Sequence, residues 1–150
     1  MSQTISPQVA LIYAMITTSA VDNRMSDPEL ERIGWIVKQL PVFRDFDETS
    51  LIQHAQACGE LMSGPEGLAL TLETISSALP EHLRETAYAL ACEVAVSDSV
   101  VIEERRFLQL LRQHLSLDKL TCAAIERGVL ARHQRLDLAA NHGVSRNSMN

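Results

Sequence analysis

Hydrophobic residues recur at helical spacing along almost the whole chain. In the first segment, Val9, Ile12 and Ile16 are three and four residues apart, which places them on one face of an α-helix. A Ser-Pro pair precedes them and supplies a cap residue and a proline suited to the first helical position. The pattern therefore predicts a helix over about residues 7–21.

A second helix is predicted directly after the first. Ser26 and Glu29 have the S-x-x-E spacing of a capping box, which marks a helix start. The apolar stripe that follows consists of Leu30, Ile33, Val37 and Leu40. Five more helices are predicted at about residues 49–62, at about 66–79, from Pro80 to the SDSVV segment, at about 102–114, and from Ser116 to about Arg135.

Composition agrees with an all-α fold of about seven helices. The chain has 150 residues, of which 46% are hydrophobic and 4% aromatic, and only six are glycine and five proline. This length suits one domain with a core of aliphatic side chains, and the few turn formers favour long helices over many short strands. We expect a helical domain over residues 1–135 and, because it is polar and lacks periodicity, a disordered tail over residues 136–150.

The chain also matches itself at an offset of 75 residues without gaps. Over the first two predicted helices, the identical pairs are Tyr13 and Tyr88, Ala14 and Ala89, Ala20 and Ala95, Val21 and Val96, Glu29 and Glu104, and Leu40 and Leu115. Because identities fall in both predicted helices at one register, the first two helices are interpreted as a hairpin and the fifth and sixth as its copy. The prediction is a compact bundle in which two hairpins are related by pseudo-two-fold symmetry around the third and fourth helices.

Charge and cysteine content restrict the classes of partner. The net charge of −6 argues against nucleic acid, since phosphate recognition needs a basic face, and leaves cations and other proteins open. Three widely spaced cysteines without a C-x-x-C motif indicate reduced thiols and a cytoplasmic location. The N-terminal sequence MSQTISPQ does not have the features of a signal peptide, and no apolar run is long enough for a transmembrane segment.

The joint inside each predicted hairpin is acidic. The segment SAVDNRMSDPELERI contains four acids, Asp22, Asp27, Glu29 and Glu31, and two arginines; the second joint has Asp98 and Glu104. Carboxylate oxygens suit a hard divalent cation such as Ca²⁺ or Mg²⁺. The alternative is that the joint is only solvated, and that Glu29 serves in a capping box with Ser26. Glu104 has no such capping box, because Val101 stands at the cap position. An EF-hand is excluded, since Asp27 stands where its loop needs glycine.

At these residues the sequence resembles the TerB family, which is linked to tellurite resistance. SAVDNRMSDPELERI is similar to the family pattern of a small-residue helix end, Asp-Gly, an aliphatic residue, and Glu in the next helix. Asp22, Met25 and Glu29 match, with Asn23 where glycine is usual. VAVSDSVVIEERRFL is similar to the second copy, with its aspartate, Asp98, displaced by one residue.

The resemblance extends over about residues 9–134 and carries several implications. It implies a compact domain of about seven helices whose acidic residues bind a divalent metal ion. The residues that would do so are Asp22, Glu29, Asp98 and Glu104. It also implies a non-enzymatic accessory or scaffold role in tellurite or metal stress, with other proteins, including a membrane-associated complex, as partners.

Two other functions fit the same residues. A pure protein–protein scaffold needs no ion, and a metal-dependent enzyme would use the acids to hold a metal that activates water. Elsewhere, His54 and Cys58 have the i, i+4 spacing of metal ligands but lack a third ligand nearby. The basic segment RGVLARHQR is interpreted either as cations at a helix C-terminus or as a contact for an acidic partner or an anionic membrane surface.

Overall fold

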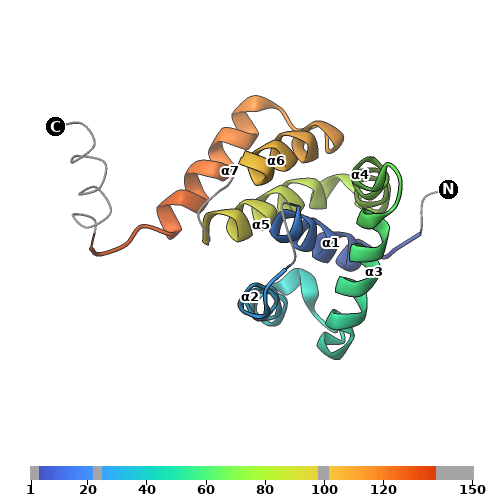
Figure 1. Cartoon of the computed structure of the whole chain (residues 1–150). Coiled ribbons are helices and arrows are strands. Elements are labelled where there is room, and N and C mark those ends of the chain that lie inside the picture. The colour runs from blue at the N-terminus through green and yellow to red at the C-terminus, as the bar shows by residue number, and fades with distance from the viewer. Residues whose placement is uncertain (1–3, 22–24, 98–101, 138–150) are drawn as a thin grey trace.

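The protein is a bundle of helices, as predicted (Figure 1). A computed structural model describes residues 4–21, 25–97 and 102–137, and within these ranges it contains seven α-helices and no strand. The helices are α1 (Pro7–Ala20), α2 (Asp27–Gln39), α3 (Leu51–Ser63), α4 (Gly67–Ala78), α5 (Arg84–Ser97), α6 (Ile102–His114) and α7 (Lys119–Arg132). Most of the tail predicted to be disordered, residues 138–150, lies outside the described ranges.

Helix α1 is the centre of the bundle. All residues from Val9 to Ser19 are buried, so that this helix is enclosed on every side rather than on the single face that Val9, Ile12 and Ile16 predict. It packs most extensively against α5, and also against α2, α3, α4 and α6. Figure 1 shows α1 and α5 together in the middle, with α6 and α7 on one side of them and α2 on the other.

The two predicted hairpins are present, because α1 packs against α2 and α5 packs against α6. Each end of α6 falls 75 residues after the corresponding end of α2, in agreement with the sequence repeat. The buried faces of α2 and α6 nevertheless differ. Ile33 and Val37 are buried in α2, whereas the equivalent residues of α6, Leu108 and Arg112, are only half-buried. The core face of α6 is instead formed by Glu104, Phe107, Leu111 and Leu115.

The predicted starts of the first two helices are confirmed by their caps. The Ser6 hydroxyl accepts a hydrogen bond from the Val9 amide at 3.1 Å. Ser26 and Glu29 form the complete capping box, with the Glu29 amide donating to the Ser26 hydroxyl at 3.3 Å and the Ser26 amide donating to the Glu29 carboxylate at 2.9 Å. Local side-chain chemistry therefore sets these two boundaries.

Helices α3, α5 and α7 begin downstream of their predicted starts, whereas α6 begins at Ile102, as predicted. The predicted start of the last helix at Ser116 is wrong, because Ser116 has a φ of 57°, in the left-handed region. The Asp118 carboxylate caps α7 instead, by accepting a hydrogen bond from the Thr121 amide at 2.7 Å. Short 3-10 turns at Glu48–Ser50 and Glu81–Leu83 occupy the predicted first residues of α3 and α5, so these two α-helices also begin later than predicted. None of the helices in the described ranges is long and apolar enough to cross a membrane.

The joint between α3 and α4 depends on a glycine. Gly67 is buried at the start of α4, and a Cβ atom added there would lie 2.0 Å from the backbone oxygen of Met62. Helix α3 contains a contrasting position, Gly59, where an added Cβ would meet no atom within 4 Å. The first glycine is therefore required by close backbone approach, and the second is not.

These two glycines predict opposite effects of the same substitution. Gly67→Ala should lower the free energy of unfolding by about 1–3 kcal/mol, because the backbone of α3 must move to admit the methyl group. Gly59→Ala should raise it by about 0.5–1 kcal/mol, because alanine loses less conformational entropy in a helix. Urea unfolding followed by circular dichroism measures both changes. Equal effects of the two substitutions would contradict the packing described for Gly67.

Candidate functional site

The first acidic joint is explained largely by helix capping. The Glu29 side chain accepts hydrogen bonds from the Ser26 hydroxyl at 2.7 Å and from the Ser26 amide, so its carboxylate is already engaged at the start of α2. Asp22, the other predicted ligand at this joint, lies outside the described residues. The structure thus confirms the capping role of Glu29 and leaves its role as a metal ligand a prediction.

The second acidic joint differs from the first. Glu104 is 4% exposed and belongs to the core face of α6, whereas the equivalent Glu29 is half-buried. Asp98 lies outside the described residues. In the part of the chain that the structure describes, three or more His, Cys, Asp or Glu side chains do not come together as a metal site. Cation binding at either joint stays a prediction.

His54 and Cys58 face different neighbours in the structure. The ring of His54 packs against that of Phe46, with 5.9 Å between the ring centroids. The thiol of Cys58 is buried and lies 3.4 Å from the Thr17 hydroxyl. Burial raises the pKa of the Cys58 thiol to about 11, so the thiol is protonated at neutral pH. These contacts support a packing role for Cys58.

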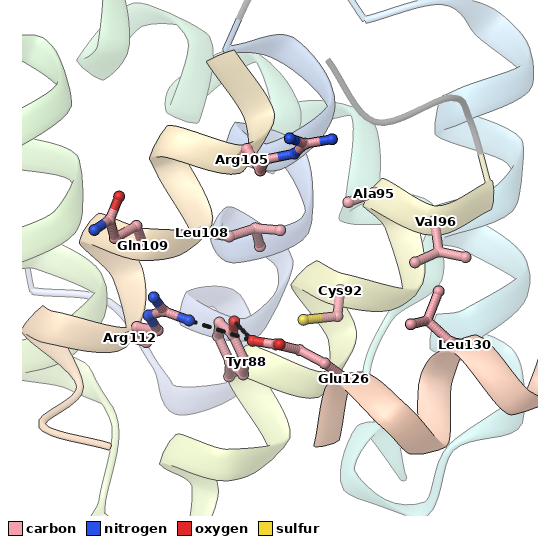
Figure 2. Close-up of a pocket in the computed structure, with 10 residues that line it drawn as sticks. All are labelled: Tyr88, Cys92, Ala95, Val96, Arg105, Leu108, Gln109, Arg112, Glu126 and Leu130. Carbon is pink, nitrogen blue, oxygen red and sulfur yellow. Dashed lines mark hydrogen bonds and ion pairs between the residues drawn. The ribbon is translucent and has the colours of Figure 1, made fainter. Parts of the chain in front are cut away.

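A cavity of about 510 Å³ lies among α5, α6 and α7 (Figure 2). Its wall consists of Tyr88, Cys92, Ala95, Val96, Arg105, Leu108, Gln109, Arg112, Glu126 and Leu130. Leu108 of α6 and Leu130 of α7 extend into the space from opposite sides, as Figure 2 shows. Its size is that of a small-molecule site, with apolar walls and a few polar groups.

One end of this cavity contains a polar network. The Tyr88 hydroxyl donates a hydrogen bond to Glu126 Oε2 at 2.5 Å, and Arg112 Nη1 lies 3.4 Å from the same oxygen. Tyr88 is 1% exposed, and burial, together with its bond to Glu126, raises its pKa. Burial also raises the pKa of the neighbouring Cys92 thiol to about 12. At neutral pH both groups are therefore protonated, and the network holds α5, α6 and α7 together.

The other end of the cavity contains Arg105, an arginine that has no ion-pair partner among the residues that the structure describes. Arg105 is exposed and forms no hydrogen bond or ion pair with any residue in the described ranges. It lies on the same face of α6 as Leu108 and Arg112, since three and four residues separate them in turn. Figure 2 shows Arg105 beyond Leu108, at the end of the cavity away from Glu126.

A second candidate site surrounds the single tryptophan of the chain. Trp35 is 62% exposed on α2 and borders two grooves, one of about 530 Å³ beside α3 and one of about 390 Å³ beside α5 and α7. We call this region the Trp35 surface. Around the first groove it consists of Asp27, Glu31, Trp35, Lys38, Glu48 and Ile52. Around the second groove it consists of Ile36, Gln39, Leu40, Leu90 and Val129. Ile52, which is 58% exposed, extends its apolar area.

The charged groups at the Trp35 surface have distinct environments. Lys38 Nζ lies 3.8 Å from Glu48 Oε1, an exposed pair. At the second groove Glu93 binds Arg132 at 2.8 Å and also His133. Within the basic segment RGVLARHQR, Arg132 therefore forms an ion pair and His133 a hydrogen bond with the same glutamate, in addition to lying at the end of α7.

The sequence analysis did not identify Trp35 as a candidate site residue, although its position in the hydrophobic pattern of α2 is unusual. The apolar stripe of α2 is Leu30, Ile33, Val37 and Leu40. Trp35 is out of phase with that stripe and falls among Glu31 and Lys38, on the polar side of the helix. This position predicts that Trp35 lies outside the core-facing stripe of α2.

Comparisons with protein-family models, with curated proteins and with solved structures gave no match to this chain. The resemblance to the TerB family therefore stays a prediction from the residues at the two joints.

The Tyr88 network predicts a coupled loss of stability. Tyr88→Phe should lower the free energy of unfolding by about 1.5–3 kcal/mol, because the hydroxyl bonds to a charged acceptor in a largely buried place. In a Glu126→Gln background, Tyr88→Phe should lower the free energy of unfolding by less, because the charged acceptor of the hydrogen bond is absent. A double-mutant cycle by urea unfolding measures this coupling. Strictly additive effects would show that the two side chains do not interact.

Proposed function

We propose that this chain is a non-enzymatic binding module that docks a partner protein through the Trp35 surface. The observation that carries the proposal is a tryptophan 62% exposed between two grooves. Tryptophan is enriched among the residues that contribute most to protein–protein affinity. Such residues cluster in well-packed pockets at the centre of an interface. The scaffold role implied by the resemblance to the TerB family supports the same conclusion.

Charge around Trp35 indicates the kind of partner. The groove beside α3 has three acids, Asp27, Glu31 and Glu48, and one cation, Lys38, which pairs with Glu48. The excess is negative, as it is for the whole chain, whose net charge is −6. A partner segment with an apolar anchor flanked by lysine or arginine would complement this surface.

Site-specific photo-crosslinking tests the docking proposal. Benzoylphenylalanine in place of Trp35 should crosslink to a basic partner in extracts of the source cells. The matched control has the same group in place of Leu120, an apolar residue of α7 that is 81% exposed and lines neither groove of the Trp35 surface. We expect the partner at position 35 and not at position 120.

The purified partner then provides the quantitative measurement. Trp35→Ala should weaken binding by more than about tenfold and change the free energy of unfolding by less than about 0.5 kcal/mol, because the side chain is mostly exposed. Leu120→Ala should leave affinity unchanged. A partner whose affinity does not depend on Trp35, or one that is crosslinked equally from both positions, would contradict the proposal.

We also propose, as a second function, that the acidic joints bind a divalent cation. The observation that favours it is the burial of Glu104 at the start of α6, where a carboxylate is more sensitive to a nearby cation than it is in water. The resemblance supports the same acids, Asp22, Glu29, Asp98 and Glu104, as ligands of a Ca²⁺ or Mg²⁺ type ion.

Calorimetric titration with Ca²⁺, Mg²⁺, Mn²⁺ and Zn²⁺ tests this second function. A saturable signal should appear and should weaken in Asp22→Asn and Asp98→Asn, which keep the shape of the side chain and remove its charge. The bound ion should raise the melting temperature, because it stabilises the folded state by mass action. Glu73→Gln, at an exposed acid of α4, is the control and should change neither result. A titration without saturable heat or a melting shift would contradict cation binding.

A further inference from the structure

We propose that the cavity among α5, α6 and α7 binds a small amphipathic carboxylate. Its anionic group would pair with Arg105, and its apolar chain would lie between Leu108 and Leu130. This site is separate from the Trp35 surface, with which it shares no lining residue. The proposal therefore does not depend on the proposed docking function.

The apolar part of the site is formed by side chains that the core leaves partly uncovered. Leu108 and Val96 are half-buried, and Leu130 is 48% exposed, although all three line the cavity. Ala95, which is fully buried, contributes a small side chain that leaves room between α5 and α6. An apolar chain placed here would cover hydrophobic surface that is now in contact with water.

Charge indicates an anionic head group and its orientation. The cavity has two arginines and one acid, a positive excess in a chain whose net charge is −6. Arg112 is paired with Glu126, whereas Arg105 makes no ion pair within the described ranges. Because the Glu126 carboxylate would repel an anion at its end of the cavity, the head group belongs at the end where Arg105 lies.

The internal repeat provides independent support. The residues of α2 equivalent to Arg105, Leu108 and Arg112 are Leu30, Ile33 and Val37, which form the apolar stripe that packs into the bundle. In the first hairpin this face therefore contributes to the core. In the second hairpin two apolar positions are arginines and the same face borders an open space. This difference between the copies is expected if the second face binds a ligand with a negative charge.

Binding of decanoate to the full chain tests the proposal, with decanol as the uncharged probe of the same chain length. Isothermal titration should show saturable binding of decanoate and weaker binding of decanol. Arg105→Gln should weaken decanoate binding by about tenfold or more, because a charge-assisted contact is lost. The matched control is Arg106→Gln, which removes the same charge from the adjacent exposed position of α6, outside the cavity wall.

A second variant examines the apolar part of the site. Leu130→Ala should weaken the binding of decanoate and of decanol alike, since it removes apolar contact and no charge. The result supports the proposal only if Arg105→Gln weakens the binding of decanoate and Arg106→Gln leaves it unchanged. Absence of saturable decanoate binding, equal affinity for decanol, or equal effects of the two arginine substitutions would each overturn it. Both arginines are exposed, so the circular dichroism spectrum should be the same for the two variants.

Discussion

Burial of α1 on every side is the constraint on which the rest of the structure depends. A helix whose residues from Val9 to Ser19 are all buried must be surrounded, and α2, α3, α4, α5 and α6 all contact it. Two of its buried polar residues, Thr17 and Thr18, have partners there, whereas the buried Ser19 hydroxyl has no hydrogen-bond partner among the described residues. Thr18 donates a hydrogen bond to the carbonyl of Ala14 at 2.7 Å, and the Thr17 hydroxyl contacts the Cys58 thiol. Burial of these hydroxyls is therefore compatible with a stable core.

The helices around α1 pack one face against the core. In α2 and α6 another face is exposed. In α2 the exposed side contains Trp35, and in α6 the exposed Arg105 lines the cavity. Both candidate sites consequently lie on helices whose positions are fixed by the same central contact. A ligand or partner at either site would meet a surface supported by rigid secondary structure, which lowers the entropic cost of binding.

The repeat shows how one hairpin plan gives two different surfaces. α2 and α6 have the same length and are 75 residues apart, yet their core faces are not equivalent. Arginines replace Leu30 and Val37 in the second copy, and an arginine is costly to bury without a partner. α6 instead packs through Phe107, Leu111 and Leu115. The face of α6 that contains Arg105, Leu108 and Arg112 borders the cavity, where Arg112 pairs with Glu126 of α7.

The sequence by itself determined the number and order of the helices, their approximate ends and the caps of α1 and α2, because periodicity and capping are local properties of the chain. It also determined the repeat. The predicted stripe of α2 contains Ile33 and Val37, which are buried, but only the tertiary structure decided that α1 is buried all round and which face of α6 is buried, since that depends on neighbours far away in the chain. The acids singled out by pattern show this contrast: Glu29 is half-buried in its cap, and Glu104, at the equivalent position, is in the core. Trp35 and Arg105 became candidates only when the grooves beside them were known, because a groove is formed by several helices at once.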